Sequence, residues 1–156
     1  GGLMLCWPCD LIISADNALF SDPVVAMGMC GVELHAHPWE VGARKAKELL
    51  FTGEAITARQ AEARGRVNRV VPTESLGAET LALAERIASR PLFALKMSKQ
   101  AVNQSLDAQG QWSAMQAAFS LHQLSHSHNV QVHRIPIDPS GIPGAVKQKP
   151  GKGSRP

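Results

Sequence analysis

The order of the expected elements changes at Pro72, and this change constrains the fold more than any other feature of the sequence. Before Pro72, short apolar runs typical of buried strands, at 10–15, 18–20 and 67–71, alternate with helical segments. After Pro72 the pattern predicts helices alone. A few short strands cannot bury both of their faces by themselves. We therefore expect an α/β fold whose sheet is completed by a segment outside this sequence.

Two helices are predicted between these strands. The first covers 38–51. The second is marked at both ends, because Thr57 is a good N-cap, Gln60 stands three residues later as its capping-box partner, and Gly65 closes the helix. The stretch 24–37 has no clean period and is interpreted as a loop with a short strand or turn.

Three further helices are predicted after Pro72, over about 75–89, 91–105 and 109–126. Prolines and glycines follow from Asn129 onward, which predicts an extended or disordered tail. We expect three regions: the α/β part at 1–72, the helical part at 73–128 and a Pro/Gly/Lys tail at 129–156.

The net charge of +3 comes from the tail. The last ten residues hold no acid and four basic residues, Lys147, Lys149, Lys152 and Arg155, and without them the chain would carry a net charge of about −1. A nucleic-acid-binding protein would carry its positive charge on folded elements. We therefore expect no nucleic-acid partner.

The sequence also argues against a membrane protein. No run approaches the roughly 18 apolar residues that a spanning helix needs. The first residues lack the basic lead and cleavage site of a signal peptide, so the three cysteines, an odd number, are expected to be reduced thiols in the cytoplasm. The chain opens on Gly1-Gly2 without an initiator Met, which is typical of a fragment.

Cys6 and Cys9 form a C-x-x-C pair. A redox pair should follow a strand and open a helix, but here the pair ends an apolar segment and a strand follows. A zinc site needs further ligands at suitable spacing, which Cys30 alone does not supply. Core packing is the favoured interpretation, and a zinc site that includes His35 is the alternative.

The six histidines include two close pairs, His35 with His37 and His122 with His126. A pair at i, i+4 can bind a metal. However, no cysteine or carboxylate stands beside the second pair in the sequence, and His122 belongs to an apolar helical stripe. We expect no metal site. The histidines are expected to pack inside the fold, to face solvent or to contact another subunit.

Read in order, these segments resemble the crotonase family of enoyl-CoA hydratases and isomerases. Gly1-Gly2-Leu3 resembles the family's Gly-Gly-Gly helix start, and Cys9-Asp10-Leu11-Ile12-Ile13 resembles its Cys-Asp-Ile-Ile strand. Further segments match the family's hairpin, its Leu-Thr-Gly-Asp-x-Ile-Ser-Ala signature, its strand ending in Pro and its C-terminal helices, at 15–20, 50–58, 61–72, 84–88 and 94–103. The resemblance covers about residues 1–128.

The resemblance implies a spiral of strand–strand–helix turns followed by helices that pack into trimers or hexamers. Residues 1–72 would be the C-terminal part of the spiral, and 73–128 the trimerisation region. The implied substrates are acyl-CoA thioesters. Coenzyme A arrives with the substrate, so no separate cofactor is implied.

The family's common chemistry stabilises an enolate-like thioester oxygen with two backbone N–H groups. The resemblance assigns one of them to Gly1 and the other to an N-terminal half outside this sequence, so the chain alone is expected to be inactive. Substrate would also contact Met4, Pro23, Val24 and Val32.

The chain departs from the family where hydratases carry their two glutamates, since those positions are Met4 and Val24. Neither side chain can transfer a proton. Other branches place a single carboxylate in the next loop, where Glu33 stands here. Glu33 is the candidate acid/base, which would require burial to raise its pKa. A surface or ion-paired glutamate is the alternative, and His35 and His37 are the next candidates.

Two functions therefore remain. The first is an acyl-CoA-processing enzyme of the enoyl-CoA hydratase/isomerase type. The second is a non-catalytic crotonase-like protein that binds acyl-CoA or only assembles, because both usual glutamates are replaced.

Overall fold

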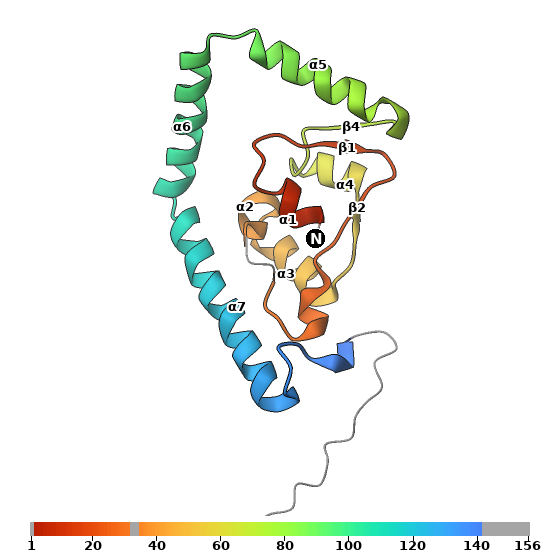
Figure 1. The fold of residues 1–156 in the computed structure, drawn as a ribbon, viewed down its shortest axis with the longest axis vertical. Coiled ribbons are helices and arrows are strands. Elements are labelled where there is room, and N and C mark those ends of the chain that lie inside the picture. Colours follow the sequence, from red (N-terminus) through yellow and green to blue (C-terminus); the bar gives the residue numbers. More distant parts are fainter. Residues whose placement is uncertain (1, 32–34, 142–156) are drawn as a thin grey trace, which may run out of the picture.

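Short strands and short helices form the centre of the structure, and long helices run around them (Figure 1). The computed structural model describes residues 2–31 and 35–141. In chain order the elements are α1 (Gly2–Cys6), β1 (Ile13–Ala15), β2 (Leu19–Phe20), η1 (Pro23–Met27), α2 (His37–Val41), α3 (Ala43–Thr52), β3 (Ile56–Thr57), α4 (Ala58–Ala63), β4 (Arg69–Val71), η2 (Thr73–Ser75), α5 (Leu76–Ala88), α6 (Leu92–Ala108), α7 (Gln111–His133) and η3 (Pro139–Gly141).

The strands of the described chain pair into two small sheets. β1 and β4 are parallel, with Ile13 opposite Arg69 and Ala15 opposite Val71. β2 and β3 are antiparallel, with Leu19 opposite Thr57. The strands expected at 10–15, 18–20 and 67–71 are confirmed, although each is shorter than expected. Two-stranded sheets are at best marginally stable alone, so these depend on the helices packed against them.

The apolar core lies between the short helices and these sheets. Helix α3 turns Ala46, Leu49 and Leu50 inward. The central cluster also takes residues from β3, α4 and β4 and their connections: Leu49, Ile56, Ala58, Ala61, Val67 and Val70. This core is small for a chain of 156 residues.

The capping box predicted for the second helix is present. The Gln60 backbone N–H donates to the Thr57 hydroxyl at 3.2 Å, and the Thr57 backbone N–H donates to Gln60 Oε1 at 2.9 Å. Gly65 follows α4 with a φ of +75°. The two reciprocal hydrogen bonds satisfy donors that a helix start leaves free, which explains why a helix as short as α4 forms.

The single helix expected over 38–51 is wrong, because Gly42 divides it into α2 and α3. Gly42 has φ +75° and ψ +156°. A residue with a Cβ adopts this region poorly, so glycine allows the chain to turn between the two helices. The stretch after Pro23, expected as a loop or turn, contains the 3₁₀ helix η1.

The last helix extends further than the sequence pattern indicated. It was expected at 109–126, but α7 continues to His133. Asn129, where the tail was expected to begin, is only 2% exposed. The chain then returns to the core, where the Asp138 backbone N–H donates to the Met27 carbonyl at 2.7 Å. The tail boundary at Asn129 is therefore corrected, because described structure reaches Gly141; residues 142–156 lie outside it.

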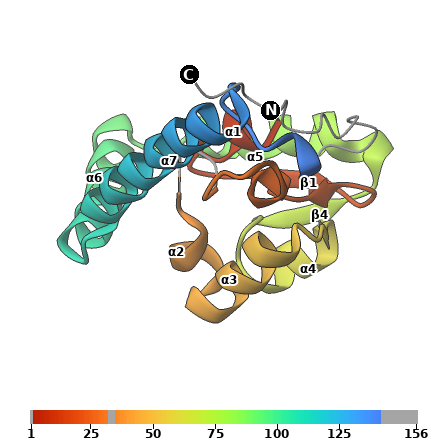
Figure 2. The ribbon, with the colours of Figure 1, turned by 90° about the horizontal axis from the view of Figure 1, so that it is seen from below.

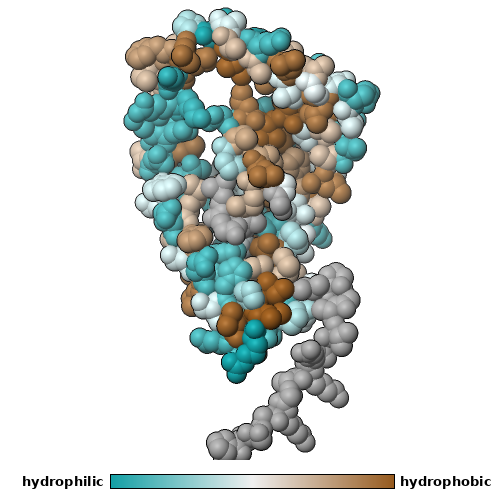
Figure 3. All heavy atoms as spheres, in the orientation of Figure 1, coloured by the Kyte–Doolittle hydropathy of each residue, from teal (hydrophilic) through white to brown (hydrophobic). Residues whose placement is uncertain are grey.

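Helices α5, α6 and α7 form an arm around the central elements (Figure 1). α6 and α7 follow one another as a long rod along one side (Figure 2). The arm leaves large apolar side chains uncovered, among them Phe93, 74% exposed, and Trp112, 58% exposed. Figure 3 shows an opening between the upper part of the arm and the central elements. Within the described ranges, none of the helices is long and apolar enough to span a membrane.

Candidate functional site

The structure describes only part of the residue set assigned from the sequence. Gly1, Val32 and Glu33 lie outside the described residues. Met4 is half-buried on α1, and Pro23 and Val24 open η1, the first exposed and the second half-buried.

A cluster of polar and ionisable side chains includes chain neighbours of these positions. We call it the polar cluster; its members are Trp7, Asp22, His35, His37, Glu40 and Arg66. Asp22 immediately precedes Pro23, and Trp7 follows Met4 by about one helical turn. The cluster therefore joins the end of α1, the start of η1, helix α2 and the loop before β4.

One half of the polar cluster is built from Asp22, His37 and His35. His37 Nε2 lies 3.1 Å from Asp22 Oδ2, and both side chains are almost fully buried. The rings of His35 and His37 have centroids 4.9 Å apart with a tilt of 48°. Trp7 meets His37 edge-on at 4.5 Å.

Burial holds the pKa of His35 below its usual value of 6.5, and the neighbouring His37 lowers it further, while Asp22 acts in the opposite direction. A lowered pKa leaves this imidazole neutral at neutral pH, so that it can accept a proton. Its Nδ1 is buried and has no hydrogen-bond partner among the described residues. His35 is thus a half-buried base beside a buried imidazole–carboxylate pair.

The other half of the polar cluster is an ion pair that holds Trp7. The indole Nε1–H donates to Glu40 Oε1. Arg66 Nε lies 3.3 Å from Glu40 Oε2, and its guanidinium carbon lies 4.5 Å above the Trp7 ring. Burial raises the pKa of Glu40 and lowers that of Arg66. This half fixes the end of α1 against α2, since three elements meet at one side chain.

Helix α7 holds the backbone at Gly28 and Gly31. His122 Nδ1 lies 2.6 Å from the Gly31 carbonyl oxygen, and Asn129 Nδ2 donates to the Gly28 carbonyl at 3.0 Å. His126 Nε2 lies 3.0 Å from His122 Nε2. The second histidine pair therefore packs as a bridge between α7 and this loop.

The cysteine motif does not join the polar cluster as a ligand set. All three cysteines are free thiols. Cys6 Sγ donates to the Leu3 carbonyl within α1, and Cys9 Sγ, from the turn that follows α1, donates to the Leu5 carbonyl. Across 2–31 and 35–141 there is no group of three or more His, Cys, Asp or Glu side chains arranged to hold a metal ion. The zinc site considered for Cys6, Cys9 and His35 finds no support in this geometry.

Sequence reasoning missed most of the polar cluster. Asp22, Glu40 and Arg66 were not candidates, and His35 and His37 ranked behind Glu33. The one available signal was the position of Asp22, next to the Pro23-Val24 pair assigned to substrate contact. Nothing local marks Glu40 or Arg66, because their burial depends on a partner far away in the sequence.

Comparison with known proteins gives a consistent result. The family profile described as enoyl-CoA hydratase/isomerase matches residues 1–135. EchA13 of Mycobacterium tuberculosis, described as a candidate enoyl-CoA hydratase, is 48% identical over 128 residues, which are 81% of this chain and 40% of that protein.

Two solved structures share the fold. The probable enoyl-CoA hydratase of Mycobacterium thermoresistibile is 58% identical with a TM-score of 0.86, and the match covers 88% of this chain and 56% of that one. The corresponding Mycobacterium smegmatis protein is 57% identical, with the same TM-score and coverage. This chain thus spans about half the length of these relatives.

The α/β spiral segment with C-terminal helices expected from the sequence is confirmed by these structures. The family match also continues past residue 128, where the resemblance was expected to stop, which agrees with the longer α7. By a family match over 135 of its 156 residues, this chain belongs to the enoyl-CoA hydratase/isomerase family.

Proposed function

We propose that a protein containing this chain processes acyl-CoA thioesters in the manner of an enoyl-CoA hydratase or isomerase. The family match over residues 1–135, together with a TM-score of 0.86 to a probable enoyl-CoA hydratase, carries this proposal. The substrate would bring its own coenzyme A, and no further cofactor is proposed.

The proposed chemistry is stabilisation of an enolate. The N–H of Gly1 would be one of two donors to the thioester oxygen, and it immediately precedes the start of α1 at Gly2. N–H groups at a helix start have no intrahelical partner and can serve a ligand. One such donor is worth about 10²–10³ in rate. The second would come from the part of the relatives that this chain does not match.

The acid/base proposed from the sequence is Glu33, and substrate contact is proposed for Met4, Pro23, Val24 and Val32. In the structure Met4 and Val24 are both half-buried, and Asp22 of the polar cluster directly precedes the Pro23-Val24 pair in the chain, which supports their assignment to the site.

We also propose that the chain is inactive alone and works in a trimer or hexamer in the cytoplasm. Residues 1–72 would complete a spiral core, and 73–128 would supply the subunit contacts. The uncovered apolar side chains of the arm support this division, because large apolar side chains such as Phe93 and Trp112 are normally buried once a protein is fully assembled.

The alternative function is a non-catalytic protein that binds acyl-CoA or only assembles. One observation favours it: the two glutamate positions of the hydratases hold Met4 and Val24, which cannot move a proton.

The test uses the full-length protein, which here means this chain joined to the segment that its relatives carry outside the matched region. The M. thermoresistibile protein can supply that segment. Binding of crotonyl-CoA is measured by calorimetry, and hydration by loss of the enoyl absorbance. Binding with turnover that collapses in Glu33→Gln supports the enzyme and its acid/base. Binding without turnover supports the alternative, and no binding of any acyl-CoA contradicts both.

A further inference from the structure

Helix α7 carries two histidines that face each other and two separate parts of the backbone. His122 Nδ1 lies 2.6 Å from the Gly31 carbonyl oxygen, and His126 Nδ1 lies 2.6 Å from the Pro136 carbonyl oxygen. Between the rings, the two Nε2 atoms are 3.0 Å apart. The rings meet edge to face, with their centroids 4.6 Å apart. Three short polar contacts thus run in a row from Gly31 to Pro136.

The protons in this row of contacts can be counted. A carbonyl oxygen can only accept, so each Nδ1 must carry a hydrogen to make its contact of 2.6 Å. A neutral imidazole has one N–H, so in two neutral rings both Nε2 atoms would be acceptors, facing each other at 3.0 Å. All three contacts are satisfied only if the pair holds a third proton between its Nε2 atoms, which gives it one positive charge.

Without the third proton, one of the two carbonyl contacts has to break. A ring that moves its hydrogen from Nδ1 to Nε2 can donate to the other histidine, but it then turns an acceptor toward its own carbonyl. The two rings differ in their freedom to move away, because His122 is 3% exposed, whereas His126 is only half-buried. The contact of His126 with Pro136 is therefore the one that gives way.

The Pro136 contact anchors residues 135–141, which we call the return segment. After α7 this segment turns back, and η3 lies beside η1 (Figure 1). The Asp138 backbone N–H donates to the carbonyl of the last residue of η1 at 2.7 Å. A Cβ on Gly141 would lie 1.4 Å from the Ala26 carbonyl oxygen, so the segment rests directly on the η1 backbone. The histidine pair thus helps to hold the return segment on η1.

Other titratable side chains border the pair and have to be separated from it in a test. At the Gly31 end these are Cys30, whose thiol donates to a carbonyl of α7, and His35, whose Nδ1 would lie 3.0 Å from a Cβ on Gly31. At the other end, His133 Nε2 lies 3.7 Å from Asp138 Oδ1. This second contact also joins α7 to the return segment, so it needs a control of its own.

We propose that His122 and His126 form a pH-sensitive latch that holds one shared proton. With the proton in place, the latch ties the Gly31 and Pro136 carbonyls to α7 and keeps the return segment on η1. When the proton passes to water, the contact with Pro136 breaks and the return segment is released from α7. This device belongs to the fold and does not depend on the reaction proposed above.

The direction of the pH effect follows from the proton count. In the open form the imidazoles behave as ordinary histidines, which are neutral above a pH of about 6.5. The closed latch then holds one proton more than the open form, so a rise in pH favours opening, by up to about tenfold per pH unit. Below this window the separated imidazoles also take up protons, so the test is made above it.

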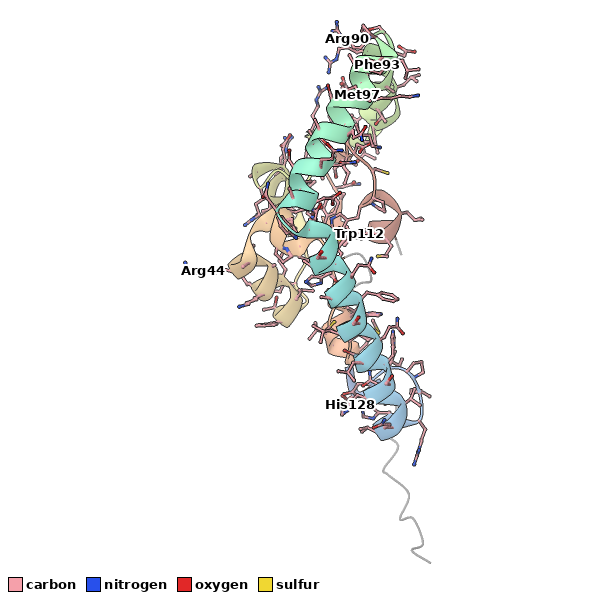
Figure 4. The ribbon with its side chains drawn as sticks, turned by 90° about the vertical axis from the view of Figure 1, so that its left-hand side faces the viewer. Arg44, Arg90, Phe93, Met97, Trp112 and His128 are labelled. Atoms are coloured by element: carbon pink, nitrogen blue, oxygen red, sulfur yellow. The ribbon has the colours of Figure 1, made fainter. Side chains whose placement is uncertain are left out.

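The experiment measures hydrogen exchange of the return segment, which contains the Asp138 N–H, in the full-length protein by mass spectrometry. Dividing each rate by the intrinsic rate at the same pH gives the opening equilibrium constant, which is followed from pH 6.5 to 8.5. The proteins are the unsubstituted one, His126→Gln, His133→Gln and the matched control His128→Gln. His128 lies on the same helix and is exposed (Figure 4).

The opening constant should rise with pH in the unsubstituted protein, in His128→Gln and in His133→Gln. In His126→Gln it should already be raised at pH 6.5 and should change less than about twofold up to pH 8.5, because no shared proton remains to be lost. Adding ZnCl₂ or EDTA should change nothing, since a proton and not a metal ion joins the rings.

An opening constant that does not change with pH in the unsubstituted protein overturns the inference. So does a pH dependence that persists in His126→Gln or disappears in His133→Gln. Slower exchange with ZnCl₂ that EDTA reverses would also overturn it, in favour of a metal bridge. No readout depends on turnover, so failure of the latch leaves the proposed function standing, and failure to bind or convert an acyl-CoA leaves the latch standing.

If His126→Gln does not fold, nitrogen-15 NMR spectra of the histidine-labelled His133→Gln protein at pH 8 decide instead. An ordinary histidine is neutral at this pH and has one protonated ring nitrogen. A signal from a ring with both nitrogens protonated supports the latch, and its absence overturns it.

Discussion

His37 Nε2 lies 3.1 Å from Asp22 Oδ2, and the two side chains are 1% and 4% exposed. This contact ties the start of α2 to the residue that precedes η1. Asp22 directly precedes Pro23, so this contact fixes the backbone at the start of η1.

Loss of this contact should lower the free energy of unfolding. Asp22→Asn keeps the shape of the side chain but removes the charge that faces the buried His37 ring, and loss of a buried polar contact costs about 1–3 kcal/mol. We expect the free energy of unfolding of the full-length protein to fall by about this amount in a urea titration at pH 7. The exposed His128→Gln variant is the control, and an unchanged midpoint for Asp22→Asn would contradict the prediction.

The pH dependence of stability should carry the signature of His35. Its folded pKa lies below the ordinary 6.5, so in the window below pH 6.5 the unfolded chain binds a proton that the folded chain does not. The free energy of unfolding should therefore fall as the pH drops through this window and be fully recovered above it.

Glu40 acts in the opposite sense, because its raised pKa makes the folded chain take up a proton at a pH above 4.5. Urea titrations of the unsubstituted protein and His35→Gln at pH 8, 7, 6 and 5.5 isolate the histidine, since Glu40 is common to both. If the free energies of unfolding of the two proteins changed in parallel with pH, this account of His35 would be ruled out.

Two substitutions at Glu40 should behave differently. Burial is the largest influence on Glu40 and outweighs its attraction to Arg66, so its charged form is disfavoured. Glu40→Gln keeps an acceptor for the Trp7 N–H and should leave the unfolding midpoint at pH 7 unchanged or raise it. Glu40→Ala removes the acceptor and should cost about 1–3 kcal/mol. A large loss in Glu40→Gln would show that the Arg66 ion pair dominates instead.

Two glycines should respond to alanine with opposite signs. Gly28 has φ +78°, and a Cβ there would lie 2.8 Å from Asn129 Oδ1 and 2.9 Å from Asp138 Cβ. Gly28→Ala should therefore destabilise the full-length protein by at least about 1–2 kcal/mol. Gly77 lies in α5 with open space around it, so Gly77→Ala should stabilise by about 0.4–1 kcal/mol. Thermal unfolding of both variants tests the pair, and a neutral Gly28→Ala would contradict the close packing of α7 on this turn.

The arm formed by helices α5 to α7 should need contact with another subunit. Phe93, Met97 and Trp112 follow one another along the α6–α7 rod and are exposed in this chain (Figure 4). We predict that the isolated 156-residue chain, as a monomer, shows no cooperative thermal transition by calorimetry. In the full-length protein, the double change Phe93→Glu with Trp112→Glu should reduce the assembly size seen by light scattering.

Arg44→Glu is the matched control for this experiment, because Arg44 is exposed on α3, away from the rod (Figure 4). A cooperative transition of the monomeric chain, or an assembly unaffected by the double change, would show that the arm does not form the subunit contact.

The sequence alone determined the elements whose signals are local. Thr57 and Gln60 lie three residues apart and meet within one helical turn, so the start of α4 could be predicted, as could the strand that ends before Pro72. Many such segments in a fixed order also established the family, because each is readable without knowing its neighbours in space.

Tertiary structure alone decided the features that depend on distant partners. Asn129 is buried because Gly28, far away in the chain, accepts its hydrogen bond, so α7 runs on where local composition predicted a tail. The polar cluster has the same origin. Its residues come from the turn after α1, the segment before η1, helix α2 with the residues before it, and the loop before β4. Their burial, contacts and pKa shifts arise only when the fold brings these segments together.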